Sequence, residues 1–343
     1  MKILMYSSVF YPSTGGMETV AEVLANEFSQ LGHEVSVVTK TPLGSEIDKD
    51  RWPFTVFRDI SLKKYGELLH NADVVLHNCI SLKQVFPDWL YRHKVFVIHH
   101  TWYNTHFNGK IVVSSYLKRW MSRLVHNCFI SNAIQSDLGI EGKVISNPYN
   151  NELFKVNNQI EKTIELVFLG RLVSDKGCYM LLQALKQMGE FDTQLNPKLT
   201  VIGDGPERKN LEDYANNNLP EQVQFLGKIE GELLASTLNK HQLMVIPSLW
   251  EEPFGVVALE GLGAGCLVIG CDGGGLKEAI GACGWTFPNG NVNVLAKLLQ
   301  SVLTQPKEWD KRYKSVSEHL YKHQPKQVAL AYLKYFKTHV KTA

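Results

Sequence analysis

The chain of 343 residues is 44% hydrophobic and 20% charged, and its formal net charge is +2. This length exceeds one typical core and predicts two domains, and the composition is that of an ordinary globular protein. No stripe of basic and aromatic residues supports nucleic-acid binding.

The N-terminal segment and the cysteines indicate the compartment. The segment from Met1 to Phe10 lacks the long apolar region and the cleavage site of a signal peptide, and is expected to form the first strand. No apolar run approaches the roughly 20 residues that a membrane span requires. The six cysteines are scattered and form no C-x-x-C pair, which argues against a zinc site or a disulfide framework. A soluble, cytoplasmic protein is expected.

Short apolar runs alternate with amphipathic segments along most of the chain, which is typical of βαβ units and a parallel sheet. In the first half, a helix is expected over Glu18–Leu31, with Gly32 as its C-terminal cap. The polar, turn-rich stretch Ser146–Asn151 indicates a domain boundary. The strands expected before it lie near Ile3–Ser7, Val35–Thr39, Thr55–Phe57, Val74–His77, Val95–His99 and Cys128–Ile130.

The second half repeats this architecture without a detectable repeat of sequence. Helices are expected over Cys178–Met188 and Glu207–Asn216. We infer an α/β fold of two Rossmann-like domains that face each other across a ligand cleft, over 1–148 and 149–320. The remainder, 321–343, is expected to be a basic helix that packs back toward the N-terminal domain. The strands expected in the second half lie near Leu166–Leu169, Leu199–Ile202, Val223–Leu226, Met244–Ile246 and Leu267–Ile269.

Two carboxylates, Glu252 and Glu260, lie eight positions apart in a stretch rich in glycine and apolar residues. Proline is tolerated in the first turn of a helix, so Pro253 predicts a helix entrance at Glu252, with Glu260 about two turns along. The free N–H groups at such an entrance attract an anion or a sugar hydroxyl. An amphipathic core helix whose acidic residues face water is the alternative. The N–H groups expected to be free belong to Phe254, Gly255, Val256 and Val257.

Two loops that follow strands carry groups suited to a phosphate-bearing ligand. Gly15 and Gly16 precede the first helix and allow a close backbone approach, although a plain tight turn is the simpler explanation for them. The absence of a G-x-G-x-x-G motif there argues against a dehydrogenase. Arg171 and Lys176 flank a loop in the second half, where they would neutralise a diphosphate without a metal, or would simply be surface cations.

A third loop begins with His99 and His100 at the end of a first-half strand, where histidines bind a ligand or satisfy the strand end. Neither a Ser-His-Asp nor a Cys-His arrangement can be identified from spacing, and the chain has no Walker loop. The chemistry therefore points to the diphosphate loop and the two carboxylates.

Four motifs occur in order: G-R-L-V-S-D-K-G at 170–177, V-I-G-D-G-P-E at 201–207, V-Q-F-L-G at 223–227 and P-S-L-W-E-E-P-F-G-V-V-A-L-E-G at 247–261. Together they resemble glycosyltransferase family 4. The resemblance implies the GT-B fold and a retaining, metal-independent transfer from a nucleotide-sugar. It places the acceptor in the first domain and the donor in the second.

The resemblance also implies a role for each matching residue. Arg171 and Lys176 would hold the donor diphosphate, and Glu260 would bind the ribose hydroxyls. Glu252 would hold the transferred sugar together with the backbone of 254–257. The expected catalytic residues are Glu252, Arg171, Lys176 and His100, with His99 as the competing histidine. Gly16 would approach the phosphates, and the backbone near Ile229 would contact the base.

The donor is expected to be UDP-glucose or a related UDP-sugar, and the acceptor a glycan or a lipid-linked saccharide. A catalytically inactive nucleotide-sugar-binding subunit and a sugar-nucleotide epimerase are the alternatives. Between Lys83 and His126 the chain is basic, with apolar residues at helical spacing. They form either a core stripe or an interfacial helix at the inner face of an anionic membrane. The stripe consists of Leu117, Trp120, Met121 and Leu124.

Overall fold

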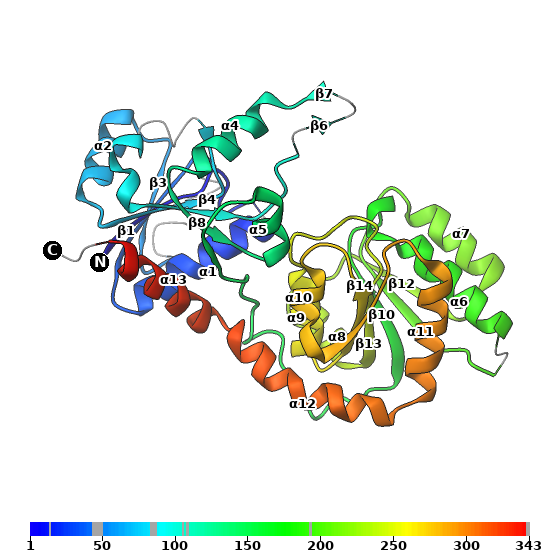
Figure 1. Ribbon diagram of the computed structural model, residues 1–343. Coiled ribbons are helices and arrows are strands. Elements are labelled where there is room, and N and C mark those ends of the chain that lie inside the picture. The colour runs from blue at the N-terminus through cyan, green and yellow to red at the C-terminus, as the bar shows by residue number, and fades with distance from the viewer. Residues whose placement is uncertain are drawn as a thin grey trace. The chain divides into compact units, whose positions relative to one another are not determined.

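The computed structural model describes residues 1–13, 15–42, 51–82, 88–104, 106–107, 110–191 and 194–340. The chain divides into two compact units (Figure 1). Unit 1 consists of Met1–Pro148 together with Pro325–Ala343, and unit 2 consists of Tyr149–Gln324. The second boundary therefore falls after Gln324 rather than after residue 320.

Within the described residues, unit 1 contains a seven-stranded sheet in the order β3-β2-β1-β4-β5-β8-β9, with every pair parallel. The central strands β4 and β5 are buried along their whole length, as expected for a parallel sheet covered on both faces. The strands are β1 (Lys2–Tyr6), β2 (Glu34–Thr39), β3 (Thr55–Arg58), β4 (Val74–Asn78), β5 (Val95–His99), β8 (His126–Phe129) and β9 (Lys143–Val144), beside a small antiparallel pair, β6 (His106–Phe107) and β7 (Lys110–Ile111).

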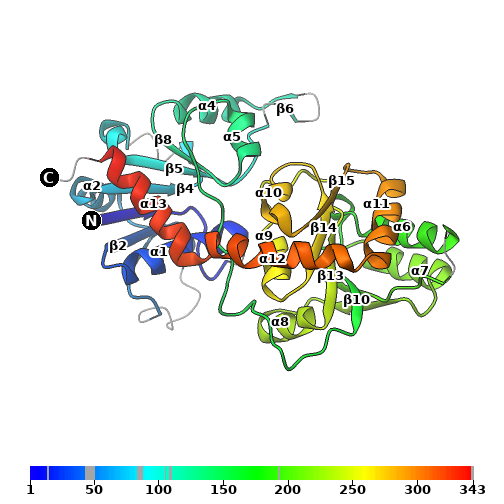
Figure 2. The ribbon, with the colours of Figure 1, turned by 60° about the horizontal axis from the view of Figure 1, so that its bottom comes forward.

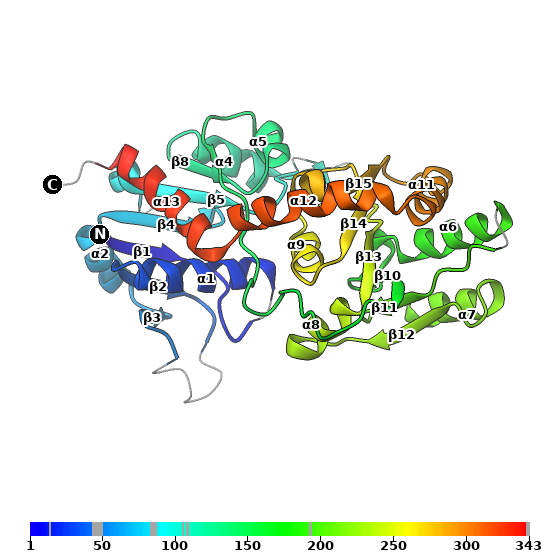
Figure 3. The same cartoon turned by 90° about the horizontal axis from the view of Figure 1, so that it is seen from below.

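The C-terminal helix of the chain belongs to unit 1. Helix α13 (Pro325–His339) lies alongside α1 (Gly16–Gln30), as Figures 2 and 3 show. The buried ring of Phe28 packs against Tyr332 and Phe336, with centroid distances of 6.5 and 6.0 Å. This aromatic contact fixes the end of the chain on the first helix. The other helices of unit 1 are α2 (Leu62–Asn71), the 3₁₀ segment η2 (Trp89–Lys94), α4 (Val113–Ser122) and α5 (Asn132–Leu138).

Unit 2 contains, in the part of the chain that is described, a six-stranded parallel sheet in the order β12-β11-β10-β13-β14-β15. Helices α6, α7 and α11 cover one face and α8, α9 and α10 the other (Figure 1). The strands are β10 (Ile164–Leu169), β11 (Leu199–Ile202), β12 (Val223–Gly227), β13 (His241–Ile246), β14 (Leu267–Cys271) and β15 (Gly284–Phe287). The helices are η3 (Ser174–Lys176), α6 (Cys178–Phe191), α7 (Arg208–Asn218), α8 (Gly231–Asn239), α9 (Val256–Gly263), α10 (Leu276–Ile280), η4 (Gly281–Cys283), α11 (Val292–Thr304) and α12 (Lys307–Lys322).

In both sheets the first strands are added toward one edge and the later strands toward the other. The point where this direction reverses, the switch point, lies between β1 and β4 in unit 1 and between β10 and β13 in unit 2. Such a reversal is the place where ligands bind in open α/β sheets. The predicted α/β architecture with two parallel sheets is confirmed. None of the helices that the structure describes combines the length and the apolarity that a membrane crossing requires.

Candidate active site

The two loops at the switch point of unit 2 are joined through their backbones. One follows β10 and carries Lys176, and the other follows β13 and carries Glu252. The N–H groups of Leu249 and Trp250 donate to the carbonyl oxygen of Asp175, at 2.8 and 3.0 Å. These bonds fix the two loops against each other.

A glycine makes this close approach possible. Gly177 has a φ of 71°, and a Cβ at this position would overlap the carbonyl oxygen of Pro247. Any other residue would be strained by the left-handed backbone and would also force the two loops apart. The glycine that ends the G-R-L-V-S-D-K-G motif therefore has a purely geometric function.

Lys176 and Glu252, predicted separately from the two loops, form an ion pair. Lys176 Nζ lies 2.5 Å from Glu252 Oε1, and the side chains are 22% and 15% exposed. Ser248 Oγ donates to the same carboxylate oxygen at 2.8 Å. Oε2 of Glu252 has no hydrogen-bond partner within the described ranges, so one carboxylate oxygen stays available to a ligand.

The predicted start of the helix that carries Glu260 is wrong. Helix α9 begins at Val256, and Pro253 lies before the helix rather than in its first turn. The reason is Gly255, whose φ of 98° is left-handed and incompatible with a helical turn, and which caps the helix instead. Glu252 consequently sits in the loop before the helix.

The N–H groups predicted to be free are nevertheless unpaired. Ala258, in the first turn, already donates to the carbonyl of Gly255 at 3.0 Å. The four preceding N–H groups have no acceptor among the residues that the structure describes, and the start of a helix carries positive partial charge. The entrance to α9 can therefore receive negative charge. These four N–H groups belong to Phe254, Gly255, Val256 and Val257.

Glu260 lies on α9 in a partly exposed position. Desolvation by the surrounding protein raises the pKa of its carboxyl group to about 7. No described residue donates a hydrogen bond to this carboxylate. A partly desolvated carboxylate that accepts no hydrogen bond is unfavourable. The Glu260 carboxylate is therefore suited to accept hydrogen bonds from a ligand.

Arg171 and Ile229 lie in the segments that follow β10 and β12 of unit 2, two strands that are separated by β11. Arg171 follows β10 after one glycine and is exposed, and its guanidinium makes no ion pair with any described residue. Ile229 lies in the loop between β12 and α8 and is partly exposed. Both remain accessible to a ligand at the carboxyl edge of the sheet.

The remaining predicted residues belong to unit 1. Gly16 is the first residue of α1, and a Cβ placed there would meet nothing within 4 Å. Packing within unit 1 therefore does not explain this glycine. The two histidines lie at the end of β5 and directly after it.

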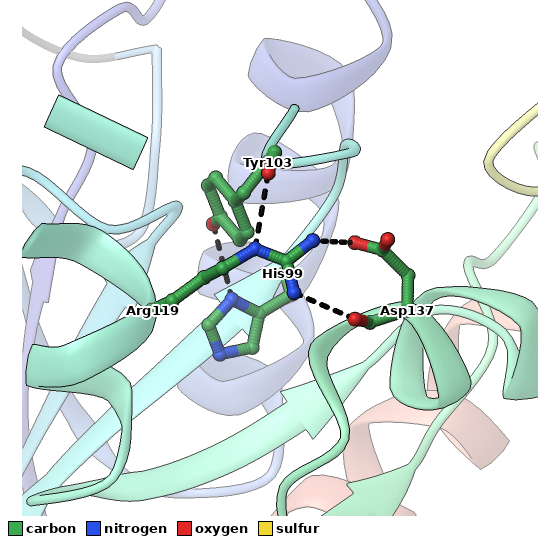
Figure 4. A network of polar contacts seen from close by, with 4 residues as sticks. All are labelled: His99, Tyr103, Arg119 and Asp137. Atoms are coloured by element: carbon green, nitrogen blue, oxygen red, sulfur yellow. Dashed lines mark hydrogen bonds and ion pairs between the residues drawn. The ribbon is translucent and has the colours of Figure 1, made fainter. Parts of the chain in front are cut away.

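His99 is a structural residue of unit 1. It is fully buried, Nδ1 lies 3.0 Å from the Tyr103 hydroxyl, and Nε2 lies 2.9 Å from Asn127 Oδ1. Arg119 donates to the Tyr103 carbonyl at 3.1 Å and forms an ion pair of 2.6 Å with Asp137 (Figure 4). Desolvation lowers the pKa of His99 to about 4, so the ring is neutral and has no nitrogen left for a ligand.

His100 keeps one nitrogen available. Its Nε2 lies 2.7 Å from Asn78 Oδ1, and Asn78 donates to Ser7 Oγ and to the Met17 carbonyl. Its Nδ1 has no hydrogen bond to any residue of the described chain. Desolvation, with a smaller contribution from His99, lowers the pKa of His100 to about 3, so the ring is neutral. This geometry favours His100 over His99 as a ligand-binding histidine.

Residues 150–322 match the family model described as glycosyl transferases group 1, and residues 14–147 match that of glycosyltransferase family 4. The chain belongs to this family. It is a glycosyltransferase of the GT-B type, and the predicted resemblance is confirmed.

Individual relatives of this glycosyltransferase are distant. It is 24% identical to the gpi3 subunit of phosphatidylinositol N-acetylglucosaminyltransferase from Schizosaccharomyces pombe, over 88% of this chain and 72% of that protein. It is 26% identical to a glycogen synthase of Mycobacterium tuberculosis, over 93% and 90% of the two chains. The structure of Anabaena HepE in complex with UDP superposes with a TM-score of 0.81 at 17% identity, covering 98% and 100% of the chains.

The structure thus brings some predicted residues of the glycosyltransferase together and leaves others in separate units. Lys176, Glu252 and the N–H groups before α9 lie on joined loops of unit 2, whereas Gly16 and His100 belong to unit 1. Ser248 and Asp175 were not predicted. A single loop serine and a backbone carbonyl carry no signal in one sequence.

Proposed function

We propose that this glycosyltransferase moves a hexose from a UDP-sugar to a hydroxyl group of a glycan or a lipid-linked saccharide, with retention of configuration. The observation that carries the proposal is the Lys176–Glu252 ion pair beside four unpaired N–H groups at the start of α9. HepE of Anabaena has been crystallised with UDP and with UDP-glucose, which supports UDP-glucose as the first donor to test.

Cleavage of the bond between the anomeric carbon and the phosphate builds negative charge on the leaving nucleotide diphosphate. Arg171 forms no ion pair with a described residue, and Lys176 is paired with Glu252, two positions before the first of the four N–H groups. We propose that these two cations and the N–H groups of 254–257 stabilise the charge, so that the reaction needs no metal ion. The charge is then held by groups that are in place before the reaction.

Glu252 is proposed to hold the transferred sugar rather than to attack it. One of its oxygens already accepts from Lys176 and Ser248, which leaves Oε2 to accept from sugar hydroxyl groups. The acceptor hydroxyl would attack the anomeric carbon on the face that the phosphate leaves, and its proton would pass to a phosphate oxygen. A sugar trapped covalently on Glu252 would contradict this mechanism, since retention would then follow the nucleophilic route known from glycosidases.

The remaining roles complete the donor site. Glu260, whose carboxylate accepts no hydrogen bond from a described residue, is proposed to accept from the two ribose hydroxyls, and the backbone at Ile229 is proposed to contact the base. For unit 1, roles for Gly16 at the phosphates and for His100 at the sugar rest on the family resemblance. The free Nδ1 of His100 is consistent with a hydrogen bond to a sugar hydroxyl.

The donor and the stereochemistry can be tested without knowledge of the acceptor. The protein would be incubated with UDP-, GDP- and ADP-sugars, nucleotide release would be measured, and the freed sugar would be identified by proton NMR. Slow release from a UDP-hexose, with an α-sugar formed first from an α-linked donor, is the expected result. Arg171→Ala should abolish that release. Tight nucleotide binding without release, also with glycan acceptors present, would instead indicate a non-catalytic binding subunit.

Helix α4 is the part of unit 1 that suits an anionic membrane. Two residues of its stripe do not lie in a core, because Leu117 is 46% and Trp120 is 53% exposed, and Val113 at the helix start is 65% exposed. Lys118 and Arg123 flank these apolar groups, and no ion pair of either side chain occurs among the described residues. Lys83 lies outside the described residues. We propose that this face contacts anionic lipid during transfer to a lipid-linked acceptor.

The double variant Leu117→Ser/Trp120→Ser should bind vesicles of anionic phospholipid about ten-fold more weakly at low salt, because two apolar side chains no longer enter the interface. Vesicle co-sedimentation measures this. Leu62→Ser is the matched control, since Leu62 is 78% exposed on α2 and should leave binding unchanged. Equal binding of the parent protein to anionic and neutral vesicles would exclude the proposed contact.

A further inference from the structure

A cavity of about 420 Å³ in unit 2 is separate from the residues of the proposed donor site. It opens between the first turns of α6 and α7 and is closed by Leu249 and by the loop that precedes α11. Arg171, Lys176, Glu252 and Glu260 are not among its lining residues. A ligand in the cavity is therefore not expected to contact these four residues.

One wall of the cavity is an exposed aromatic ring. Tyr179, in the first turn of α6, is 45% exposed, and its ring packs edge-on against Tyr214 of α7 at a centroid distance of 4.9 Å. This contact restrains the ring while its open surface faces the cavity or solvent. Leu249, which is 46% exposed, and Met180 extend the apolar surface.

The same cavity carries polar side chains without a hydrogen-bond partner in the part of the chain that the structure describes. Four polar residues line it, and none of them makes a side-chain hydrogen bond to a residue in the described part of the chain. They supply amide donors, amide and carboxylate acceptors, and a hydroxyl group. They are Ser174, Gln183, Glu207 and Asn210.

The charge of the lining selects the class of ligand. Glu207 is the one ionisable side chain besides Tyr179, and no lysine, arginine or histidine is among the lining residues that the structure describes. A phosphate-bearing ligand would meet a carboxylate without a neutralising cation, which is unfavourable. A neutral ligand with one apolar face and a hydroxylated edge fits both the ring and the free polar groups.

A pyranose ring has this distribution of groups, with C–H bonds on its faces and hydroxyls around its edge. We propose that the cavity is a binding site for a neutral saccharide unit, with Tyr179 as the platform and with Glu207 and Asn210 as hydroxyl-binding groups. Ser174 and Leu249 in its wall belong to the loops that carry Lys176 and Glu252, and Asp175 joins those loops. A glycan chain bound here would be held beside the donor loops of unit 2.

Isothermal titration with maltotetraose, cellotetraose and N-acetylchitotetraose tests the proposal. Saturable binding of at least one of them is expected, and it should persist in saturating UDP because the donor residues do not line the cavity. Tyr179→Ala should weaken this binding about ten-fold through loss of the platform, and Glu207→Gln and Asn210→Ala should weaken it through lost hydrogen bonds. Tyr321→Ala is the matched control, since Tyr321 is 54% exposed on α12 and should leave binding unchanged.

The outcomes separate this site from the proposed transfer reaction. UDP affinity of Tyr179→Ala should equal that of the parent protein, and its thermal unfolding should stay cooperative with a small decrease in Tm from the lost contact with Tyr214, which shows that the variant is folded and that its donor site is intact. Absence of saturable binding to all three tetrasaccharides, or equal affinity of the parent protein and Tyr179→Ala, would overturn the saccharide site even if transfer activity were demonstrated. Competition between UDP and the tetrasaccharide would overturn the claim of a separate cavity.

Discussion

Replacing Lys176 with alanine should lower kcat for sugar transfer by about 100- to 1,000-fold, because a cation positioned for the developing diphosphate charge is lost. The same change removes the partner of Glu252, which lies 2.5 Å away in the ion pair. Steady-state release of the nucleotide measures the effect. The side chains are only 22% and 15% exposed, so loss of the pair should also lower the free energy of unfolding, and chemical denaturation of the variant separates this effect from the lost activity.

A double-mutant cycle distinguishes a shared function from two separate ones. If Lys176 and Glu252 act as one unit, Lys176→Ala combined with Glu252→Gln should cost no more than the worse single change. Strictly additive losses would contradict a functional pair. Lys297→Ala provides the matched control, because Lys297 is an exposed lysine on α11 of the same unit and should retain the parent activity.

The strands of the sheets could be predicted because parallel strands buried on both faces are rich in consecutive apolar residues, as in β4, β5 and β14. Short or polar strands have no such signal. β9 contains two residues, and β15 contains glycine, tryptophan and threonine, so neither was predicted. The start of α9 was missed for a different reason. Pro253 is compatible with a first helical turn, but the left-handed conformation of Gly255 is visible only in the structure.

The candidate site could be predicted as a set of residues but not as a set of contacts. Lys176 and Glu252 are separated by 76 positions in the sequence. They meet because β10 and β13, which precede their loops, are neighbours in the sheet although they are not consecutive in the chain. For the adjacent histidines, the sequence left two choices. Only the side-chain partners distinguish His99, with both nitrogens bonded, from His100, with one nitrogen free.

Binding of UDP, the nucleotide of the proposed donor, should depend on pH through Glu260. Desolvation raises the pKa of this carboxyl group from 4.5 to about 7. Ribose hydroxyls donate to the ionised form, so the dissociation constant should be constant above about pH 8 and should rise as the pH falls below 7. The rise should approach about ten-fold per pH unit, the limit for one proton. Titration calorimetry between about pH 5 and pH 8 measures it.

Glu260→Gln isolates this group, since its amide accepts a hydrogen bond but does not ionise. We expect the variant to bind UDP with an affinity that does not change over this range, and weaker than the parent at pH 8 because the charged acceptor is lost. An unchanged pH profile in the variant would assign the dependence to another group.

The same residue links binding to stability. Because the pKa of Glu260 is raised in the folded state, the unfolded chain releases this proton more easily, so the stability that Glu260 contributes is full below pH 4.5 and is lost as the pH rises through 7. Glu260→Gln should therefore gain stability relative to the parent between about pH 5 and pH 8, in chemical denaturation at each pH. A variant that is more stable at pH 8 but binds UDP more weakly would indicate that the fold carries an unfavourable, partly desolvated carboxylate for the benefit of its ligand.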